Sequence, residues 1–222
     1  MGEARATPAK GVLLIDIRDE SVGGLIRDIG KRIASPGGGT VAGLQAALGA
    51  SLLRMVANYS QGPKFEHVST AVAAILAELE VLEARSLDAA NEDARAFDAV
   101  GRAYAAKPGV GLDPAERREA IGRALDAAAD APAKLIVVCG ELVALAEELA
   151  PIGNSSVIAD VAAAAASIRA AVSTSVVNLE ANLPSVKDPA RLRNFERILQ
   201  NVSRVRNRAD ALVESVRNPV AA

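Results

Sequence analysis

Aromatic side chains are scarce in this 222-residue chain: they make up 2% of the residues, and tryptophan is absent. Proteins that bind nucleic acid commonly stack bases on aromatic rings and follow the phosphate backbone with clustered cations. Here the 25 basic residues are offset by 27 acidic ones and form no basic tract. The composition therefore argues against a nucleic-acid partner.

The chain has one cysteine, Cys139, and one histidine, His67. A lone cysteine cannot form an intrachain disulfide, and one cysteine with one histidine cannot build a Cys/His metal cluster. We therefore expect no metal and no covalently bound cofactor. A reducing cytoplasm is the expected location.

Long uninterrupted hydrophobic runs are missing as well. Asp160 and Arg169 interrupt the apolar stretch 157–177, and three glutamates interrupt the stretch that follows Leu135. A bilayer-spanning helix needs about 20 consecutive apolar residues. No membrane span is expected.

Hydrophobic residues, mostly Ala, Val and Leu, make up 50% of the chain, which is enough for a substantial core. They recur at helical spacing, and Pro, Gly, Ser and Asp mark the breaks. This pattern predicts an all-α bundle of about seven helices with long central helices. The expected helices span 21–35, 40–60, 65–106, 114–129, 131–151, 153–182 and 189–216.

The domain organisation follows from the same pattern. Residues 1–20 form an N-terminal tail, with an extended segment possible over 12–17, and residues 21–222 form one helical domain. Long helices with faces of small residues favour a two-fold homodimer.

A glycine-rich turn precedes the second expected helix and contains Ser35, Pro36, Gly37, Gly38 and Gly39. Three residues without a Cβ leave the backbone open to a ligand, and Thr40 is a plausible N-cap. A helix N-terminus attracts an anion or an electron-rich ligand edge. The turn is therefore a candidate binding site, with a plain interhelical turn as the alternative.

Polar residues within the alanine-rich helices supply the other candidates. Asp93 and Phe97 lie one helical turn apart, so Asp93 could lean into an apolar pocket, where its pKa would rise. The alternative is a solvated acid. Asn178 and Asn182 share a face at i, i+4, and paired amides suit a ring with alternating donors and acceptors.

The remaining candidates are more isolated. Asn154 and Asp160 lie near the start of the sixth expected helix, where capping or interhelical hydrogen bonding is the alternative role. Lys64 and Lys107 flank the third helix, where either could hold an anionic tail or be solvated.

Five segments in order resemble the cyclodeaminase domain of formiminotransferase-cyclodeaminases and the freestanding methenyltetrahydrofolate cyclohydrolases of that family. They are Ser35 to Ala42 with Ala46 to Asn58, Gly62 to Phe65, Glu92 to Phe97, Gly153 to Asp160, and Asn178 to Leu183. The resemblance covers residues 21–216.

The resemblance implies an all-helical homodimer that acts on a tetrahydrofolate derivative as its small-molecule substrate. It implies that Asp93 is the catalytic acid/base and that the turn from Ser35 to Thr40 helps to form the folate site. Lys64, Asn154, Asp160, Asn178 and Asn182 would be further pocket residues.

Two departures bear on activity. Many family members have Asp where this chain has Asn91, which removes a possible second carboxylate, and Lys107-Pro108 stands where Leu-Pro-Lys is common. We expect a formimidoyltetrahydrofolate cyclodeaminase, which converts 5-formiminotetrahydrofolate to 5,10-methenyltetrahydrofolate and ammonia. The alternatives are a 5,10-methenyltetrahydrofolate cyclohydrolase that gives 10-formyltetrahydrofolate, and a folate-binding helical dimer without activity.

Overall fold

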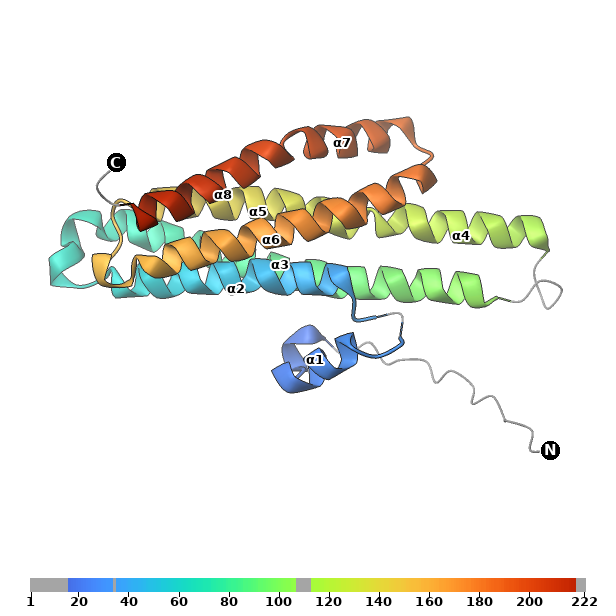
Figure 1. Ribbon diagram of the computed structural model, residues 1–222, viewed down its shortest axis with the longest axis horizontal. Helices are drawn as coiled ribbons and strands as arrows, with labels where there is room; N and C mark the ends of the chain where they lie inside the picture. The colour runs from blue at the N-terminus through green and yellow to red at the C-terminus, as the bar shows by residue number, and fades with distance from the viewer. Residues whose placement is uncertain (1–15, 34, 107–112, 219–222) are drawn as a thin grey trace.

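The computed structural model describes residues 16–33, 35–106 and 113–218, and all regular structure within them is helical (Figure 1). The all-α prediction is confirmed. Four short 3-10 helices cover Ile17–Asp19, Pro63–Val68, Ser155–Val157 and Leu183–Ser185. The α-helices are α1 (Val22–Ile29), α2 (Gly38–Tyr59), α3 (Ser69–Ala105), α4 (Pro114–Ala128), α5 (Asp130–Leu149), α6 (Ala159–Asn182), α7 (Pro189–Gln200) and α8 (Val202–Arg217).

The described residues contain eight α-helices where about seven were predicted, because the last expected helix is divided. α7 ends at Gln200 and α8 begins at Val202, with Asn201 between them. The Asn201 side chain donates to the carbonyl of Arg197, a local hydrogen bond of the kind that competes with regular helix. The predicted extended segment at 12–17 lies mostly outside the described residues, and Ile17 begins a 3-10 turn.

Four predicted boundaries are wrong. α1 ends at Ile29, with Gly30 as its C-cap, rather than at Ser35. Short 3-10 turns precede α3 and α6, so these helices start later than expected. Thr40 is not the N-cap of α2: Gly37 occupies that position, and Thr40 lies in the first turn, where its N–H donates to a carboxylate from α3.

α2 lies at the centre of the bundle and packs against α3, α5 and α6. Small residues let the neighbouring helices approach closely. A Cβ on Gly43 would lie 2.6 Å from the Cβ of Ala90 in α3, and one on Gly49 would lie 2.6 Å from Cγ1 of Ile168 in α6. The small-residue face of α2 therefore sets the spacing of the central helices.

The core continues through α5, α6 and α8, and α7 extends outward from α8 (Figure 1). α6 runs antiparallel to α2, since Gly49 faces Ile168 whereas Gly38 faces Asn178. The C-terminal part of α3 continues past the N-terminus of α2 and pairs with α4. This leaves a recess where the start of α2 meets α3, α4 and α6.

By length and composition alone, α2 and α6 could each cross a membrane. In the bundle, 56% of the apolar window of α2 and 44% of that of α6 are buried. Helices at the core of a bundle commonly have this composition.

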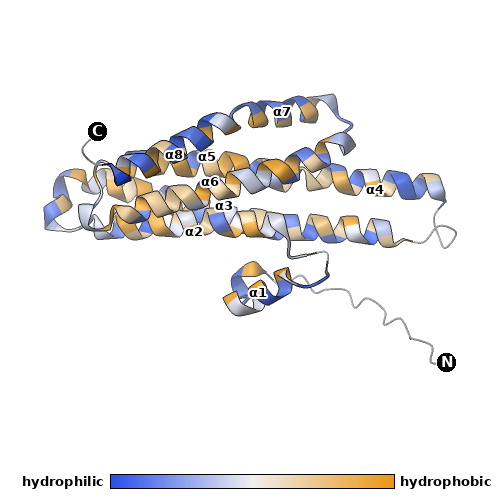
Figure 2. Ribbon diagram, viewed as in Figure 1, coloured by the Kyte–Doolittle hydropathy of each residue, from blue (hydrophilic) through white to orange (hydrophobic). Residues whose placement is uncertain are grey.

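α1 is the exception to this packing. It lies apart from the long helices (Figure 1), and no residue of α1 is buried. Its apolar residues Val22 and Ile26 are exposed, and Figure 2 shows hydrophobic residues on this helix.

Candidate active site

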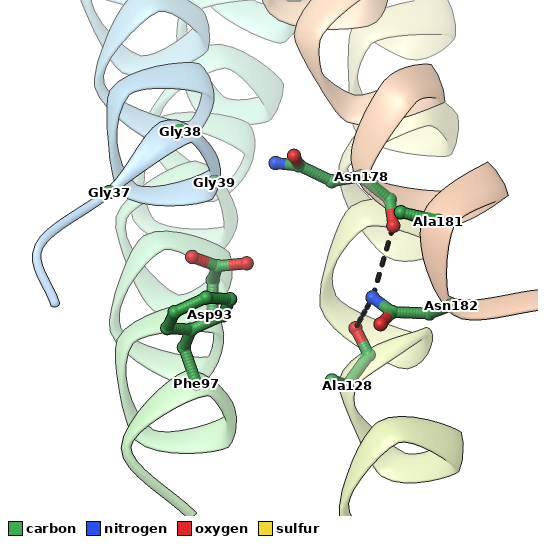
Figure 3. A pocket seen from close by; sticks show the side chains of 9 residues that line it. All are labelled: Gly37, Gly38, Gly39, Asp93, Phe97, Ala128, Asn178, Ala181 and Asn182. Atoms are coloured by element: carbon green, nitrogen blue, oxygen red, sulfur yellow. Dashed lines mark hydrogen bonds between the residues drawn. The ribbon is translucent and has the colours of Figure 1, made fainter. Parts of the chain in front are cut away.

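A cavity of about 130 Å³ lies at the N-terminus of α2, between α3 and α6 (Figure 3). Most of its lining is glycine, alanine and one aromatic ring, with one carboxylate and two amides among them. The lining residues are Gly37, Gly38, Gly39, Asp93, Phe97, Ala128, Asn178, Ala181 and Asn182. The structure thus brings together the glycine turn, Asp93 and the Asn178/Asn182 pair from three separate parts of the chain.

Gly39 and Asp93 are in direct contact. A Cβ built on Gly39 would lie 2.0 Å from the carboxyl carbon of Asp93, closer than real contacts allow. In Figure 3 the carboxylate points from α3 toward the turn. Only glycine at position 39 therefore permits this placement of the acid. Gly38 differs, because its Cβ would meet Asn178 Oδ1 at an ordinary 3.6 Å.

Burial raises the pKa of Asp93 from 3.8 to about 6. The backbone N–H of Thr40 donates to the carboxylate and acts in the opposite direction. A carboxylate near the N-terminus of α2 also gains from the helix dipole. The solvated-acid alternative does not describe Asp93, because the carboxyl group is largely removed from water. A group with this pKa can both accept and donate a proton near neutral pH.

The two asparagines have different surroundings although both line the cavity. Asn182 Nδ2 donates to the carbonyls of Ala128 and Asn178, at 3.3 and 3.0 Å (Figure 3). Asn182 therefore ties α6 to the end of α4. The side-chain amide of Asn178 faces Gly38 and has no hydrogen-bond partner among the described residues. Its donors and acceptor are available to a ligand.

Phe97 is 51% exposed and lies one turn after Asp93 on the cavity wall. Its ring lies next to the Asp93 carboxyl group in Figure 3. An exposed aromatic ring beside a cavity can pack against a planar ligand.

The other residues of the turn support the cavity without lining it. Ser35 and Pro36 precede Gly37 and are partly buried. Thr40 is 2% exposed, and its Oγ1 is buried with no partner among the described residues. Thr40 thus acts on the site through its backbone N–H.

Lys64, Asn154 and Asp160 lie at the other end of the bundle. Asn154 is bonded to Tyr59 and Ser60 at the C-terminus of α2, about 33 Å from Gly38, since a helix rises about 1.5 Å per residue. Lys64 follows α2, and Asp160 lies in the first turn of α6. Within one chain, these three residues do not share the cavity. Lys107 lies outside the described residues.

Asn91 is buried but does not line the cavity. Its Oδ1 accepts from the N–H of Ile17 at 3.0 Å, and its Nδ2 donates to Asp16 Oδ1 at 2.8 Å. Asn91 therefore fastens the N-terminal segment to α3, two residues before the acid.

Three lining residues were absent from the predicted site: Phe97, Ala128 and Ala181. The spacing of Phe97 from Asp93 signalled a shared face, and Ala181 lies on the face defined by Asn178 and Asn182. Nothing in the sequence marks Ala128, which reaches the cavity because α4 ends there. Among the described residues, no cluster of three His, Cys, Asp or Glu side chains is arranged to hold a metal ion.

Fold and cavity together define a helical protein that offers a single desolvated carboxylate to a small ligand. The chain belongs to the formiminotransferase-cyclodeaminase family, whose family model matches residues 21–201. The resemblance seen in the sequence is confirmed.

Two relatives illustrate the family. A methenyltetrahydrofolate cyclohydrolase from Methylorubrum extorquens is 30% identical over 202 residues, which cover 89% of this chain and 97% of that protein. The formimidoyltransferase-cyclodeaminase of Mus musculus is 32% identical over 171 residues, 77% of this chain. The chain spans about a third (32%) of the length of that protein.

A solved structure shares the fold. The crystal structure of a formiminotetrahydrofolate cyclodeaminase from Thermotoga maritima superposes with a TM-score of 0.76 at 26% identity. The match covers 90% of this chain and 98% of that one. The chain is therefore an enzyme of the cyclodeaminase and cyclohydrolase family.

Proposed function

We propose that the protein is a formimidoyltetrahydrofolate cyclodeaminase that closes the one-carbon bridge between N5 and N10 of tetrahydrofolate, with Asp93 as its acid/base. The observation that carries this proposal is the Asp93 carboxyl group, held against Gly39 in the cavity with its pKa raised to about 6. The name of the Thermotoga maritima protein supports the same reaction.

The cavity suits the pterin end of a folate. Its volume of about 130 Å³ accommodates a ring system rather than a whole folate, whose remainder would extend toward solvent past Phe97. The apolar walls and the Phe97 ring would contact the faces of the pterin. The free amide of Asn178 would read its edge, because an amide offers both donors and an acceptor.

Asp93 would move one proton in the cyclodeamination. N10 attacks the carbon of the protonated formimino group on N5 (–CH=NH2⁺), and the carboxylate takes the N10 proton as the bond forms. The carboxyl group then returns this proton to the amino nitrogen of the tetrahedral intermediate. Ammonia leaves, the C–N bond breaks, and the methenyl cation remains beside the carboxylate, which stabilises its charge.

A second candidate is the cyclohydrolase reaction, which the end-to-end match with the Methylorubrum extorquens protein supports. Water would add to the methenyl carbon and lose a proton to Asp93. Asp93 would deliver that proton to N5 as the ring opens, and the second proton of the water is released. In both reactions one carboxylate carries a proton from the nucleophile to the departing nitrogen, so one cavity could serve either.

One spectroscopic experiment tests both candidates. The protein is given 5-formiminotetrahydrofolate and, separately, 5,10-methenyltetrahydrofolate, and the absorbance of the methenyl chromophore is followed. Growth of the chromophore with ammonia release identifies the cyclodeaminase, and accelerated loss identifies the cyclohydrolase.

Asp93→Asn is the matched variant in this assay. It keeps the shape of the side chain but cannot carry the proton, so we expect a loss of about 10²–10⁴-fold in kcat. Unchanged turnover in Asp93→Asn would contradict the proposal. Folate binding without turnover in the wild-type protein would identify the inactive helical dimer instead.

A further inference from the structure

α1 and the residues just after it present apolar side chains that the described part of the chain leaves exposed. Val22 and Ile26 are 75% and 64% exposed, Ile33 just beyond the helix is 45% exposed, and no residue of α1 is buried. Figure 2 shows hydrophobic residues on α1, which lies apart from the long helices. A soluble helix normally turns such a face toward a core.

This helix needs a surface to pack against. Isolated helices shorter than about 12–15 residues are marginal in water even when they are rich in alanine. α1 has eight residues, and two of them are Gly23 and Gly24, which disfavour helix. The cap from Ser21 to the N–H of Gly24 is too small a contribution to offset this.

The chain holds α1 away from its own bundle by fixing the segment that leads into it. Asn91 binds Asp16 and Ile17, and Arg18 pairs with Asp88 and donates to the carbonyl of Ala84. These contacts secure residues 16–18 along α3, and α1 projects from this attachment (Figure 1).

A groove that is lined partly by apolar residues, like the exposed face of α1, runs between α3 and α5. Two adjoining cavities, of about 460 and 170 Å³, share Arg85. Their floor is apolar and includes Val81, which is 56% exposed, with Leu82 and Val138. The groove follows α3 from Ala77 to Glu92, about 22 Å, which is longer than the roughly 12 Å of α1.

The charges of the two surfaces are complementary. The arm over residues 22–33 has three cations and one carboxylate, and Arg27 and Arg32 have no ion-pair partner among the described residues. The groove has one ion pair where the two cavities adjoin, Arg85 with Glu141, and one at the end near Glu92, Lys134 with Glu92. Two further carboxylates line the groove: Asp88 pairs with Arg18 of the same chain, and Glu78 is unpaired among the described residues. Opposite charges at the rim would set the register of docking.

We propose that α1 is an exchanged arm, which packs its apolar face into the α3/α5 groove of a second copy of the chain. Two-fold symmetry would place the arm of each copy in the groove of the other copy, so each contact is made twice. This inference specifies the surface of the predicted homodimer and is independent of the folate chemistry.

Paired cysteine variants test the exchange. Cys139 is fully buried, and burial raises the pKa of its thiol, so introduced cysteines would be the reactive ones. Ile26→Cys and Val81→Cys proteins are prepared separately, mixed and oxidised. We expect a disulfide-linked species of twice the chain mass in the mixture, and none in either protein alone.

Each other outcome overturns the proposal. A mixture that does not cross-link, or a cross-link that forms only within one chain of the double variant, excludes exchange into the groove. Dimers of Ile26→Cys alone would show that the arms pair with each other. The folate assay on the same samples is unaffected by these outcomes, because neither position lines the active-site cavity.

Association measurements supply the matched control. Ile26→Asp should raise the dimer dissociation constant at least tenfold. Leu48→Asp, which charges an equally exposed apolar position on α2, should change it less than twofold. The reverse result would place the interface on the α2 face and refute the exchanged arm.

Discussion

The two ends of α2 are both lined with polar residues, but only one end satisfies them internally. At the C-terminal end, the Ser60 hydroxyl donates to the carbonyl of Val56 at 2.7 Å and accepts from the N–H of Asn154 at 2.8 Å. Asn154 Nδ2 donates to the carbonyl of Tyr59 at 3.0 Å, and its Oδ1 accepts from Ser156. These groups stabilise the fold and leave little for a ligand.

At the N-terminal end, the polar groups are mostly without partners. Asp93 receives a hydrogen bond from Thr40 but is largely desolvated, and neither the Asn178 amide nor the buried Thr40 Oγ1 has a partner in the part of the chain that the structure describes. Buried polar groups without partners cost stability. The polar groups are paired at the C-terminal end of α2 and largely unpaired at its N-terminal end. We therefore infer that the groups at the N-terminal end serve ligand binding or catalysis rather than stability.

The comparison predicts opposite effects of mutation at the two ends. Removing polar groups at the cavity should lower activity while sparing or raising stability. Removing them at the far end should lower stability while sparing activity.

The largest expected effect is on the stability of Asp93→Asn. The folded chain holds the Asp93 proton up to about pH 6, whereas the unfolded chain releases it near 3.8, so wild-type stability falls as pH rises through this interval. Asn has no charge to desolvate. Above about pH 7 the variant should therefore be more stable by up to about 3 kcal/mol.

Urea denaturation of both proteins at several pH values checks this prediction. The difference between them should shrink below about 1 kcal/mol near pH 4, where both states of the wild-type protein begin to be protonated. A difference that does not depend on pH would show that Asp93 is not desolvated.

Gly39→Ala should have a slightly smaller effect, on activity. The new methyl group would lie 2.0 Å from the Asp93 carboxyl carbon, so the carboxyl group must move away. A misplacement of about 1 Å can lower the rate a hundredfold. We expect kcat/KM to fall about a hundredfold or more. Gly122→Ala in α4, where a Cβ would meet nothing within 4 Å, is the control and should stay within about threefold. Equal effects at both positions would remove the special role of Gly39.

The smallest effects separate the two asparagines. Asn178→Ala should raise KM about tenfold, the equivalent of one lost ligand hydrogen bond, with stability changed by less than about 0.5 kcal/mol. Asn154→Ala should lower stability by about 1–2 kcal/mol, because it removes a cap and an interhelical bond, and should leave KM unchanged. Steady-state kinetics and thermal unfolding of both variants check this prediction. A raised KM in Asn154→Ala together with a loss of stability in Asn178→Ala would contradict it.

Much of the fold was accessible from local sequence signals. Ser21, Asp113 and Asp188 cap their helices through side chains, and the expected helices began at or directly after these three residues. The start of α2 was misplaced because its N-cap is Gly37, which makes no side-chain cap hydrogen bond, so the local pattern pointed to Thr40 instead. The division at Asn201 depends on a hydrogen bond rather than on a loss of hydrophobic spacing.

The candidate site was only partly accessible for a similar reason. Helical spacing placed Asn178 with Asn182, and Asp93 with Phe97, on shared faces, and the cavity contains all four. The same reasoning could not distinguish Asn154 from Asn178, because residue type does not reveal whether an amide has a partner. The length of α2 separates the two asparagines, and this separation appears only when α6 is packed against it.

The most direct test of the central claim is an NMR titration of the Asp93 side-chain carboxyl carbon, assigned by comparison with Asp93→Asn. We predict a midpoint near pH 6 in the free protein, from burial in the cavity, and a change in that midpoint when a folate analogue is added. A midpoint near 3.8 that the analogue leaves unchanged would contradict the assignment of this cavity as the active site.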